Sequence, residues 1–235
     1  MPDKPRRPSR PTPSESPDWR RAILGAESRW PAFAAAFVII VGQARLSSSL
    51  QLHPSWLLPV LAAALLVISI AFYVAPGENG RVGRAIPLGL AGVLVVANIG
   101  SLVLLVRGVF IGSALSPLNL LESGVALWVV NVLVFAIVYW ELDGGGPEAR
   151  IERLRAYPDL VFPQQQSDQD HLASGDWQPS FGDYAYVSLT NSTAFSPTDT
   201  MPYTKRAKFV MGVQSLLSFA IAAVLVARSV NIARG

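Results

Sequence analysis

Long stretches of this chain contain no charged residue. No Asp, Glu, Lys or Arg occurs between Leu46 and Gly77, and residues 87–106 are likewise uncharged. Runs of 18 or more apolar residues with few or no charges are typical of helices that cross a membrane. Only 15% of the 235 residues are charged, whereas an ordinary soluble domain has about 25%. The pattern therefore argues against a soluble enzyme and predicts an all-α integral membrane protein.

Five apolar segments predict four or five transmembrane helices. They cover residues 30–44, 55–75, 87–111, 123–140 and 209–227. The first is short, because 15 residues of helix reach roughly 22 Å and the hydrocarbon core is about 30 Å thick. It either spans the bilayer, with the side chain of Arg45 reaching the interface, or lies along the membrane surface.

Composition divides the chain into three parts. Residues 1–29 predict a disordered basic tail, because a Pro- and Arg-rich segment buries too little apolar area to offset the entropy lost on ordering. Residues 30–122 carry the first three apolar segments. Residues 123–235 carry the last two, with an acidic loop at 141–183 that has nine acids and three arginines.

Polar residues also lie inside the apolar segments. Asn98 and Ser101 fall near the middle of the third segment, and Asn131 falls in the fourth. Buried amides and hydroxyls of this kind commonly form hydrogen bonds between membrane helices. We expect Asn98 and Asn131 to serve helix packing.

The segment before the last apolar stretch has a distinctive order. Residues 183–191 predict a helix too short to cross a membrane; small and hydroxyl residues follow, and then Asp199, Pro202 and Thr204. This order of helix, half-length helix, polar turn, Asp-x-x-Pro-x-Thr and final helix resembles the pore module of the tetrameric potassium-channel superfamily, over residues 123–235. The chain is also similar to a group of bacterial multi-pass membrane proteins that share its Thr-Ala-Phe-Ser-Pro-Thr-Asp segment and have no known activity.

The channel resemblance implies a re-entrant, pore-like half-helix before the last helix. It places the pore helix at residues 184–189 and the inner helix at 207–231. The filter positions fall on Thr193, Ala194, Phe195, Ser196, Pro197, Thr198 and Asp199. Ser196 and Thr198 stand where the family has glycines, and Pro197 has a fixed φ and no N–H to donate. We therefore do not expect the ring of carbonyls that replaces the water of a potassium ion.

The resemblance implies a homotetrameric, channel-like protein of the bacterial cell membrane. Its hydrated pore would prefer monovalent cations weakly and would not be potassium-selective. Gln214, Ser218 and Ala222, spaced four residues apart, are expected to line the pore cavity, and the acidic loop is expected to concentrate cations in front of it.

An alternative function is a non-conducting membrane scaffold or accessory protein. In that case residues 183–204 form a packed loop. Thr200 would then cap the last helix, and Met201 and Pro202 would begin it.

We expect no enzymatic activity, cofactor, metal site or nucleic-acid partner. The chain has no cysteine, and His53 and His171 have no partner at metal-ligand spacing. No nucleophile–base pair or nucleotide-binding motif is present, and the net charge of +3 is too small to favour nucleic acid.

The side of the membrane that carries the acidic loop depends on the first apolar segment, because Lys and Arg near segment ends favour the cytoplasm. If all five segments span with the N-terminus inside, 15 of the 19 Lys and Arg are cytoplasmic, and so is the loop. If the first segment lies on the inner surface, 11 of 19 are cytoplasmic and the loop faces outward, as in the channel family. The sequence leaves both orientations open.

Overall fold

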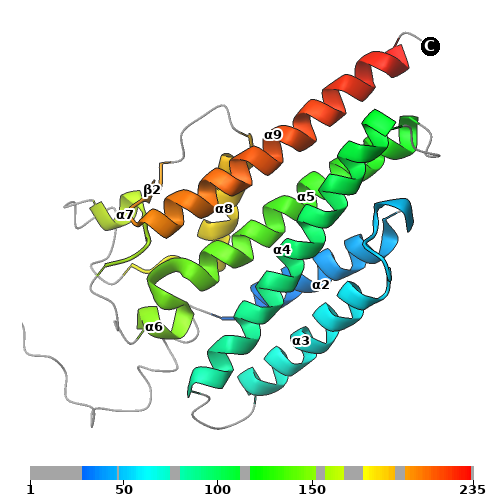
Figure 1. Ribbon diagram of the computed structural model, residues 1–235. Coiled ribbons are helices and arrows are strands. Elements are labelled where there is room, and N and C mark those ends of the chain that lie inside the picture. Colours follow the sequence, from blue (N-terminus) through cyan, green and yellow to red (C-terminus); the bar gives the residue numbers. More distant parts are fainter. Residues whose placement is uncertain are drawn as a thin grey trace, which may run out of the picture.

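Helices dominate the part of the chain that the structure describes. This computed structural model describes residues 28–46, 48–74, 80–111, 117–151, 157–166, 177–193 and 199–233. Five long helices form a bundle (Figure 1): α2 (Trp30–Arg45), α3 (Leu57–Val74), α4 (Gly80–Ile111), α5 (Pro117–Leu142) and α9 (Lys205–Ala233). The shorter elements are η1 (Ser48–Leu50), η2 (Asp143–Gly145), α6 (Pro147–Ile151), β1 (Leu160–Val161), α7 (Pro163–Gln166), α8 (Phe181–Thr193) and β2 (Met201–Pro202).

Four helices are long and apolar enough to cross a membrane. The spans are Leu57–Val74, Gly83–Val109, Leu118–Arg150 and Lys205–Ala227. The fifth long helix, α2, has 16 residues and reaches roughly 24 Å, less than the thickness of a hydrocarbon core. The prediction of an all-α membrane protein with four or five spanning helices is thus confirmed for four helices by length and composition.

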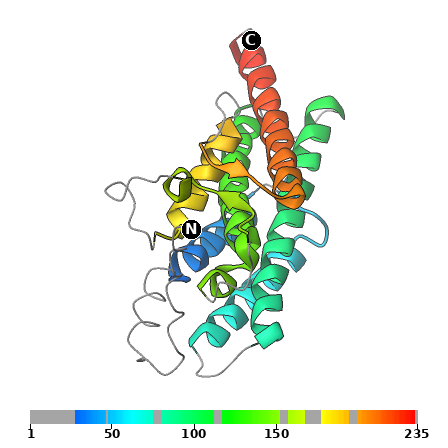
Figure 2. The same cartoon turned by 90° about the vertical axis from the view of Figure 1, so that its left-hand side faces the viewer.

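The long helices alternate in direction. Side chains from the start of α2, the end of α3 and the start of α4 line one small cavity together with Glu148, just beyond α5. The start of α9 is bonded to the same end through Asp159, as described below. We call this the cap end and the opposite one the far end. The cap end lies at the left of Figure 1 and faces the viewer in Figure 2. In Figure 2, α8 and α4 lie on opposite sides of α5.

A buried ion pair fixes the start of α2 at the cap end. The Arg29 guanidinium donates to Glu141 Oε1 at 3.0 Å and to Glu148 Oε1 at 3.3 Å, and it lies 5.3 Å from the ring centroid of Trp140. The side chains of Arg29 and Glu141 are 8% and 4% exposed. Arg29 falls in the predicted tail 1–29 but belongs to the folded bundle, whereas residues 1–27 lie outside the described residues.

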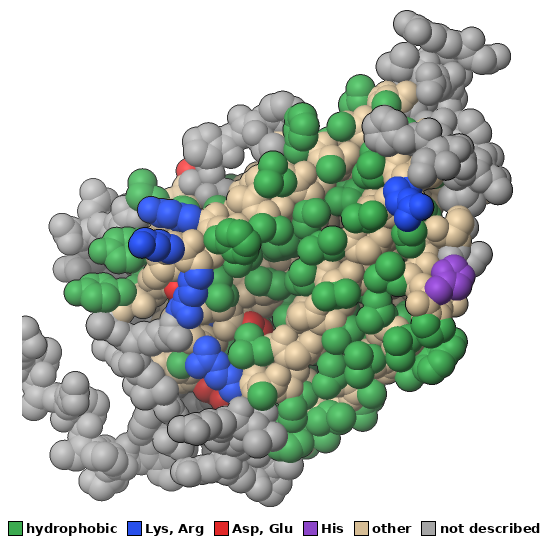
Figure 3. Space-filling view, viewed as in Figure 1, with side chains coloured by type: hydrophobic (Ala, Val, Ile, Leu, Met, Phe, Trp, Pro, Cys, Tyr) green, Lys and Arg blue, Asp and Glu red, His purple; other side chains and the backbone are tan. Residues whose placement is uncertain are grey.

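The bundle has apolar residues both inside and outside. Leu94, Leu127 and Phe135 are among its buried core residues, whereas Phe209 and Leu216 on α9 are each 72% exposed. Figure 3 shows hydrophobic side chains over most of the visible surface between the two ends. An apolar surface of this kind is what a lipid-facing helix bundle requires.

The last helix begins later than the alternative interpretation predicted. Met201 and Pro202 form β2, which pairs antiparallel with β1, so they do not begin the helix. The cap is Thr204, whose Oγ1 accepts a hydrogen bond from the N–H of Ala207 at 3.3 Å. Thr200 is therefore not the helix cap, because two paired strand residues separate it from the helix.

Candidate functional site

α8 is a helix of 13 residues that lies against α5 and α9. At its start, the N–H and Oγ of Ser180 both donate to Asp183 Oδ2 at 2.7 Å, so the carboxylate of Asp183 caps the first turn. Tyr184, Val187 and Ser188 lie on its buried face, as spacings of three and four residues require. The helix predicted at 183–191 is thus present and extends two residues further at each end.

Gln214, in α9, holds α8 in place. Its Nε2 donates to the Ser188 carbonyl at 2.9 Å, and to the hydroxyls of Ser188 and Ser192 at 2.7 Å. Its Oε1 accepts from Asn191 Nδ2 at 2.8 Å and from the hydroxyl of Tyr139 in α5. A single buried amide thus connects α5, α8 and α9.

A second set of polar bonds joins α4, α5 and α9. Asn98 Nδ2 donates to Asn131 Oδ1 at 2.8 Å, and Asn131 Nδ2 donates to Ser218 Oγ at 2.9 Å. All three residues are buried. The prediction that Asn98 and Asn131 serve helix packing is confirmed.

The three predicted cavity residues do not share one surface. Gln214 and Ser218 are 0% and 1% exposed, and their hydrogen bonds are made within the chain. Ala222, one turn beyond Ser218 on α9, is exposed. Within one chain, Gln214 and Ser218 therefore connect helices.

Only the two ends of the predicted filter lie among the described residues. Thr193 ends α8; its side chain is exposed and its hydroxyl donates to the Thr190 carbonyl at 2.9 Å. Asp199 is exposed as well. Ala194, Phe195, Ser196, Pro197 and Thr198 lie outside the described residues.

Two buried aspartates anchor this segment at the cap end, and we call them the aspartate clamp. Asp143 follows α5 and accepts three hydrogen bonds. Its Oδ1 receives the N–H groups of Asp159 and Leu160 at 2.6 and 3.0 Å, and its Oδ2 receives the hydroxyl of Tyr184 at 2.7 Å. The first carboxylate of the clamp thus joins the end of α5 to β1 and to the first turn of α8.

Asp159, the second member, joins this end to α9. Its carboxylate accepts from the N–H of Gly144 at 3.2 Å, from the Thr204 hydroxyl at 2.6 Å, and from Arg206 Nε and Nη2 at 2.6 and 2.5 Å. Gly144 has φ of +58°, a conformation that glycine adopts without steric cost. A bidentate Arg–carboxylate pair of this kind compensates the charge of a carboxylate that is 0% exposed.

The contacts of α8 show how far it extends from the clamp. Tyr184, in its first turn, is bonded to the clamp, and Asn191, near its end, donates from Nδ2 to the Met211 carbonyl at 3.0 Å. Gln214, which is also bonded to Asn191, lies nine residues after the start of α9, which corresponds to roughly 14 Å along the helix axis. Among the described residues, α8 thus extends from the clamp to the level of Gln214, and Thr204 lies at the clamp.

Sequence reasoning missed the clamp. In the sequence, Asp143 and Asp159 contribute only to the count of acids in the loop 141–183. The described acids of the loop 141–183 serve the fold: Glu141 and Glu148 bind Arg29, Asp143 and Asp159 form the clamp, and Asp183 caps α8. Asp159 lies 47 residues before its arginine partner, and no periodic pattern in the sequence reveals such a pair.

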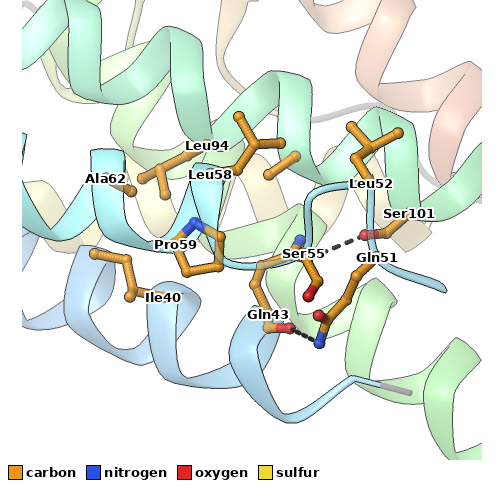
Figure 4. A pocket seen from close by; sticks show the side chains of 11 residues that line it. Ile40, Gln43, Gln51, Leu52, Ser55, Leu58, Pro59, Ala62, Leu94 and Ser101 are labelled. Carbon is orange, nitrogen blue, oxygen red and sulfur yellow. Dashed lines mark hydrogen bonds between the residues drawn. The ribbon is translucent and has the colours of Figure 1, made fainter. Parts of the chain in front are cut away.

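Two further cavities lie at opposite ends of the bundle. One of about 260 Å³ opens beside the clamp and is lined by Arg150, Tyr157 and Trp177, among others. The other lies at the far end (Figure 4), where Gln43, Gln51, Ser55 and Ser101 lie beside apolar side chains of α2, α3 and α4. Its free volume of about 20 Å³ admits about one water molecule, which would meet the unbonded Nε2 of Gln43.

Comparisons of the chain with family models, with curated proteins and with solved structures found no match. Within the described ranges, no three His, Asp or Glu side chains are grouped so that they could hold a metal ion.

Proposed function

We propose that the chain is a channel-like protein of the bacterial cell membrane. In this proposal α8 and residues 194–199 form a re-entrant element, and four copies of it surround a hydrated pathway that weakly prefers monovalent cations. The observation that supports the proposal is that α8 extends from the aspartate clamp to the level of Gln214, whereas Thr204, just before α9, lies at the clamp.

The backbone chemistry after α8 supports this proposal. The last carbonyls of a helix have no partner within the helix, and non-helical backbone at membrane depth is tolerated only where protein or water covers it. Thr193 and Asp199, which flank residues 194–198, have exposed side chains. In the proposed assembly, water or further copies of the same segment would satisfy the polar groups that follow α8.

The proposal changes the role of the predicted cavity residues. Gln214 and Ser218 hold α8 and α5 against α9, because their hydrogen bonds lie inside one chain. The pathway is then lined by the turn itself. Thr193 supplies a hydroxyl and Asp199 supplies the charge that favours cations.

Flux through vesicles that contain the purified protein tests this function. We expect both Na⁺ and K⁺ to pass, and Asp199→Asn or Thr193→Val to lower the flux severalfold. Glu122→Gln is the matched control, because it removes one negative charge near the start of α5, at the far end of the bundle from the clamp. An absence of flux, or equal flux in all four proteins, would contradict the proposal.

The assembly is tested separately. Because the chain has no cysteine, Thr193→Cys introduces a single thiol at the end of α8. We expect oxidation to link copies within a fourfold assembly in mild detergent. A monomer, or a twofold dimer without linkage at this position, would contradict the tetramer.

A non-conducting scaffold is the second candidate. The internal hydrogen bonds of Gln214 and Ser218 favour it, because a packed core has no aqueous route. It predicts a stable monomer or dimer with no ion flux and with stability that does not depend on residues 194–198.

A further inference from the structure

Basic residues are unevenly distributed between the two ends of the bundle. By the helix directions given above, seven Lys and Arg in described helices or beside them lie at the cap end, and three lie at the far end. The first group is Arg29, Arg81, Arg84, Arg150, Lys205, Arg206 and Lys208, and the second is Arg45, Arg107 and Arg228. Figure 3 shows the Lys and Arg side chains concentrated around the start of α9 and below it. By the positive-inside rule, the cap end faces the cytoplasm.

The first turn of α9 carries more positive charge than its neighbours compensate. It contains three basic residues and no acid. Arg206 is paired with Asp159, whereas Lys205 and Lys208 are exposed and have no carboxylate within 4.0 Å among the described residues. Positive side chains at a helix start are unfavourable next to the positive end of the helix dipole. An external anion would relieve this charge.

An apolar notch continues from the two lysines along the same helix. At roughly 100° per residue, Lys205, Phe209, Gly212 and Leu216 lie within about 60° of one another around α9. Phe209 and Leu216 are each 72% exposed. Between them Gly212 leaves a gap, since a Cβ placed there would have no neighbouring heavy atom within 4 Å. The strip thus presents the ammonium group of Lys205, with that of Lys208 beside it, next to exposed apolar side chains and the open space at Gly212, which we call the notch.

We propose that this strip, Lys205, Lys208, Phe209, Gly212 and Leu216, binds one anionic phospholipid of the cytoplasmic leaflet. The two ammonium groups donate to the lipid phosphate, and an acyl chain lies in the notch at Gly212. The charge selects an anionic headgroup, and the notch distinguishes a lipid from a free phosphate. Tyr203, which is 61% exposed just before α9, lies where aromatic side chains favour the headgroup region.

Native mass spectrometry in detergent tests the site with phosphatidylglycerol, phosphatidylcholine and inorganic phosphate as probes. We expect phosphatidylglycerol to bind in preference to phosphatidylcholine, and Lys205→Gln with Lys208→Gln to weaken that binding about thirtyfold. The matched control is Arg45→Gln with Arg107→Gln, which removes two exposed positive charges at the far end and leaves binding unchanged. Equal binding of both lipids, or equal loss in both double variants, would overturn the proposal.

The notch is tested by Gly212→Leu, which keeps every charge. We expect it to weaken phosphatidylglycerol binding several-fold without lowering the thermal stability of the lipid-free protein. Inorganic phosphate that competes fully with the lipid would instead indicate an anion site and overturn the lipid assignment.

The leaflet is tested by Met201→Cys, an exposed position beside the strip. An impermeant maleimide should label it in inverted vesicles and not in right-side-out ones; the reverse result would overturn the cytoplasmic assignment. These readouts are independent of ion flux, so the lipid site and the channel function can fail separately.

Discussion

Gln214 uses both ends of its amide to bind α8 and α5 at once. Replacing it with Leu would leave the hydroxyls of Ser188, Ser192 and Tyr139 buried without this partner. Buried polar groups that lose a partner typically cost 1–3 kcal/mol, so we expect Gln214→Leu to lower the free energy of unfolding by about 2 kcal/mol. Denaturant unfolding in detergent measures this. Ala222→Leu, on the exposed face of α9, should have almost no effect, and equal effects of the two changes would argue against the anchoring role.

The aspartate clamp predicts an asymmetry between its charged partners. Asp159 is 0% exposed, whereas the side chain of Arg206 is 43% exposed. Arg206→Gln leaves the buried carboxylate of Asp159 without its cation and should lower the free energy of unfolding by about 3 kcal/mol. Asp159→Asn leaves an arginine that water can hydrate, and should cost less. Lys205→Gln, in the same turn, is the control for loss of charge. The reverse order of the two main effects in unfolding experiments would contradict the assignment of Asp159 as the group that needs compensation.

At the scale of elements, α2 depends on a single buried charge pair at its start. The side chain of Glu141 is only 4% exposed, so removing Arg29 would leave this buried carboxylate without its nearest cation. We expect Arg29→Met to destabilise the protein by about 3 kcal/mol, and Glu141→Gln added to it to restore part of the loss. Thermal unfolding measures both effects. Arg45→Met, at the exposed end of the same helix, should change little; if the second substitution gives no rescue, the pair is not what holds α2.

The long helices could be predicted from the sequence because each has a run of apolar residues that only a helix can satisfy in lipid. The short helix α8 was also predictable, since Asp183 marks its start and Tyr184 and Val187, three residues apart, mark its buried face. The cap end was not. β1 and β2 have two residues each and are 40 positions apart, and the pairing of Asp159 with Arg206 depends on that contact. The scaffold alternative began the last helix too early for the same reason, because Met201 and Pro202 lie in a strand, whereas the channel resemblance placed its start at 207, two residues late.

For the whole molecule, the bundle indicates that α2 crosses between the two ends. It begins at the cap end with Arg29, and its last turn is bonded at the far end, where Gln51 Nε2 donates to the carbonyls of Gln43 and Leu46. Ser101 in α4 also donates to Gln43 Oε1 at 3.0 Å. These contacts favour the first of the two orientations that the sequence left open, with the chain crossing five times.

Single cysteines at the two ends of α2 test this topology. If α2 spans, Ser28→Cys and Leu52→Cys should react with an impermeant maleimide from opposite sides of the membrane, because five crossings place the ends of α2 in different compartments. If α2 lies on the surface, both should react from the same side. At 16 residues the helix is several ångströms shorter than the hydrocarbon core, so a spanning α2 requires local thinning of the bilayer with Arg45 at the interface. Reaction of both from one side would also contradict the cytoplasmic placement of the cap end. With four crossings, the orientation that the positive-inside rule prefers has 11 of 19 basic residues on the inner side and the cap end outside.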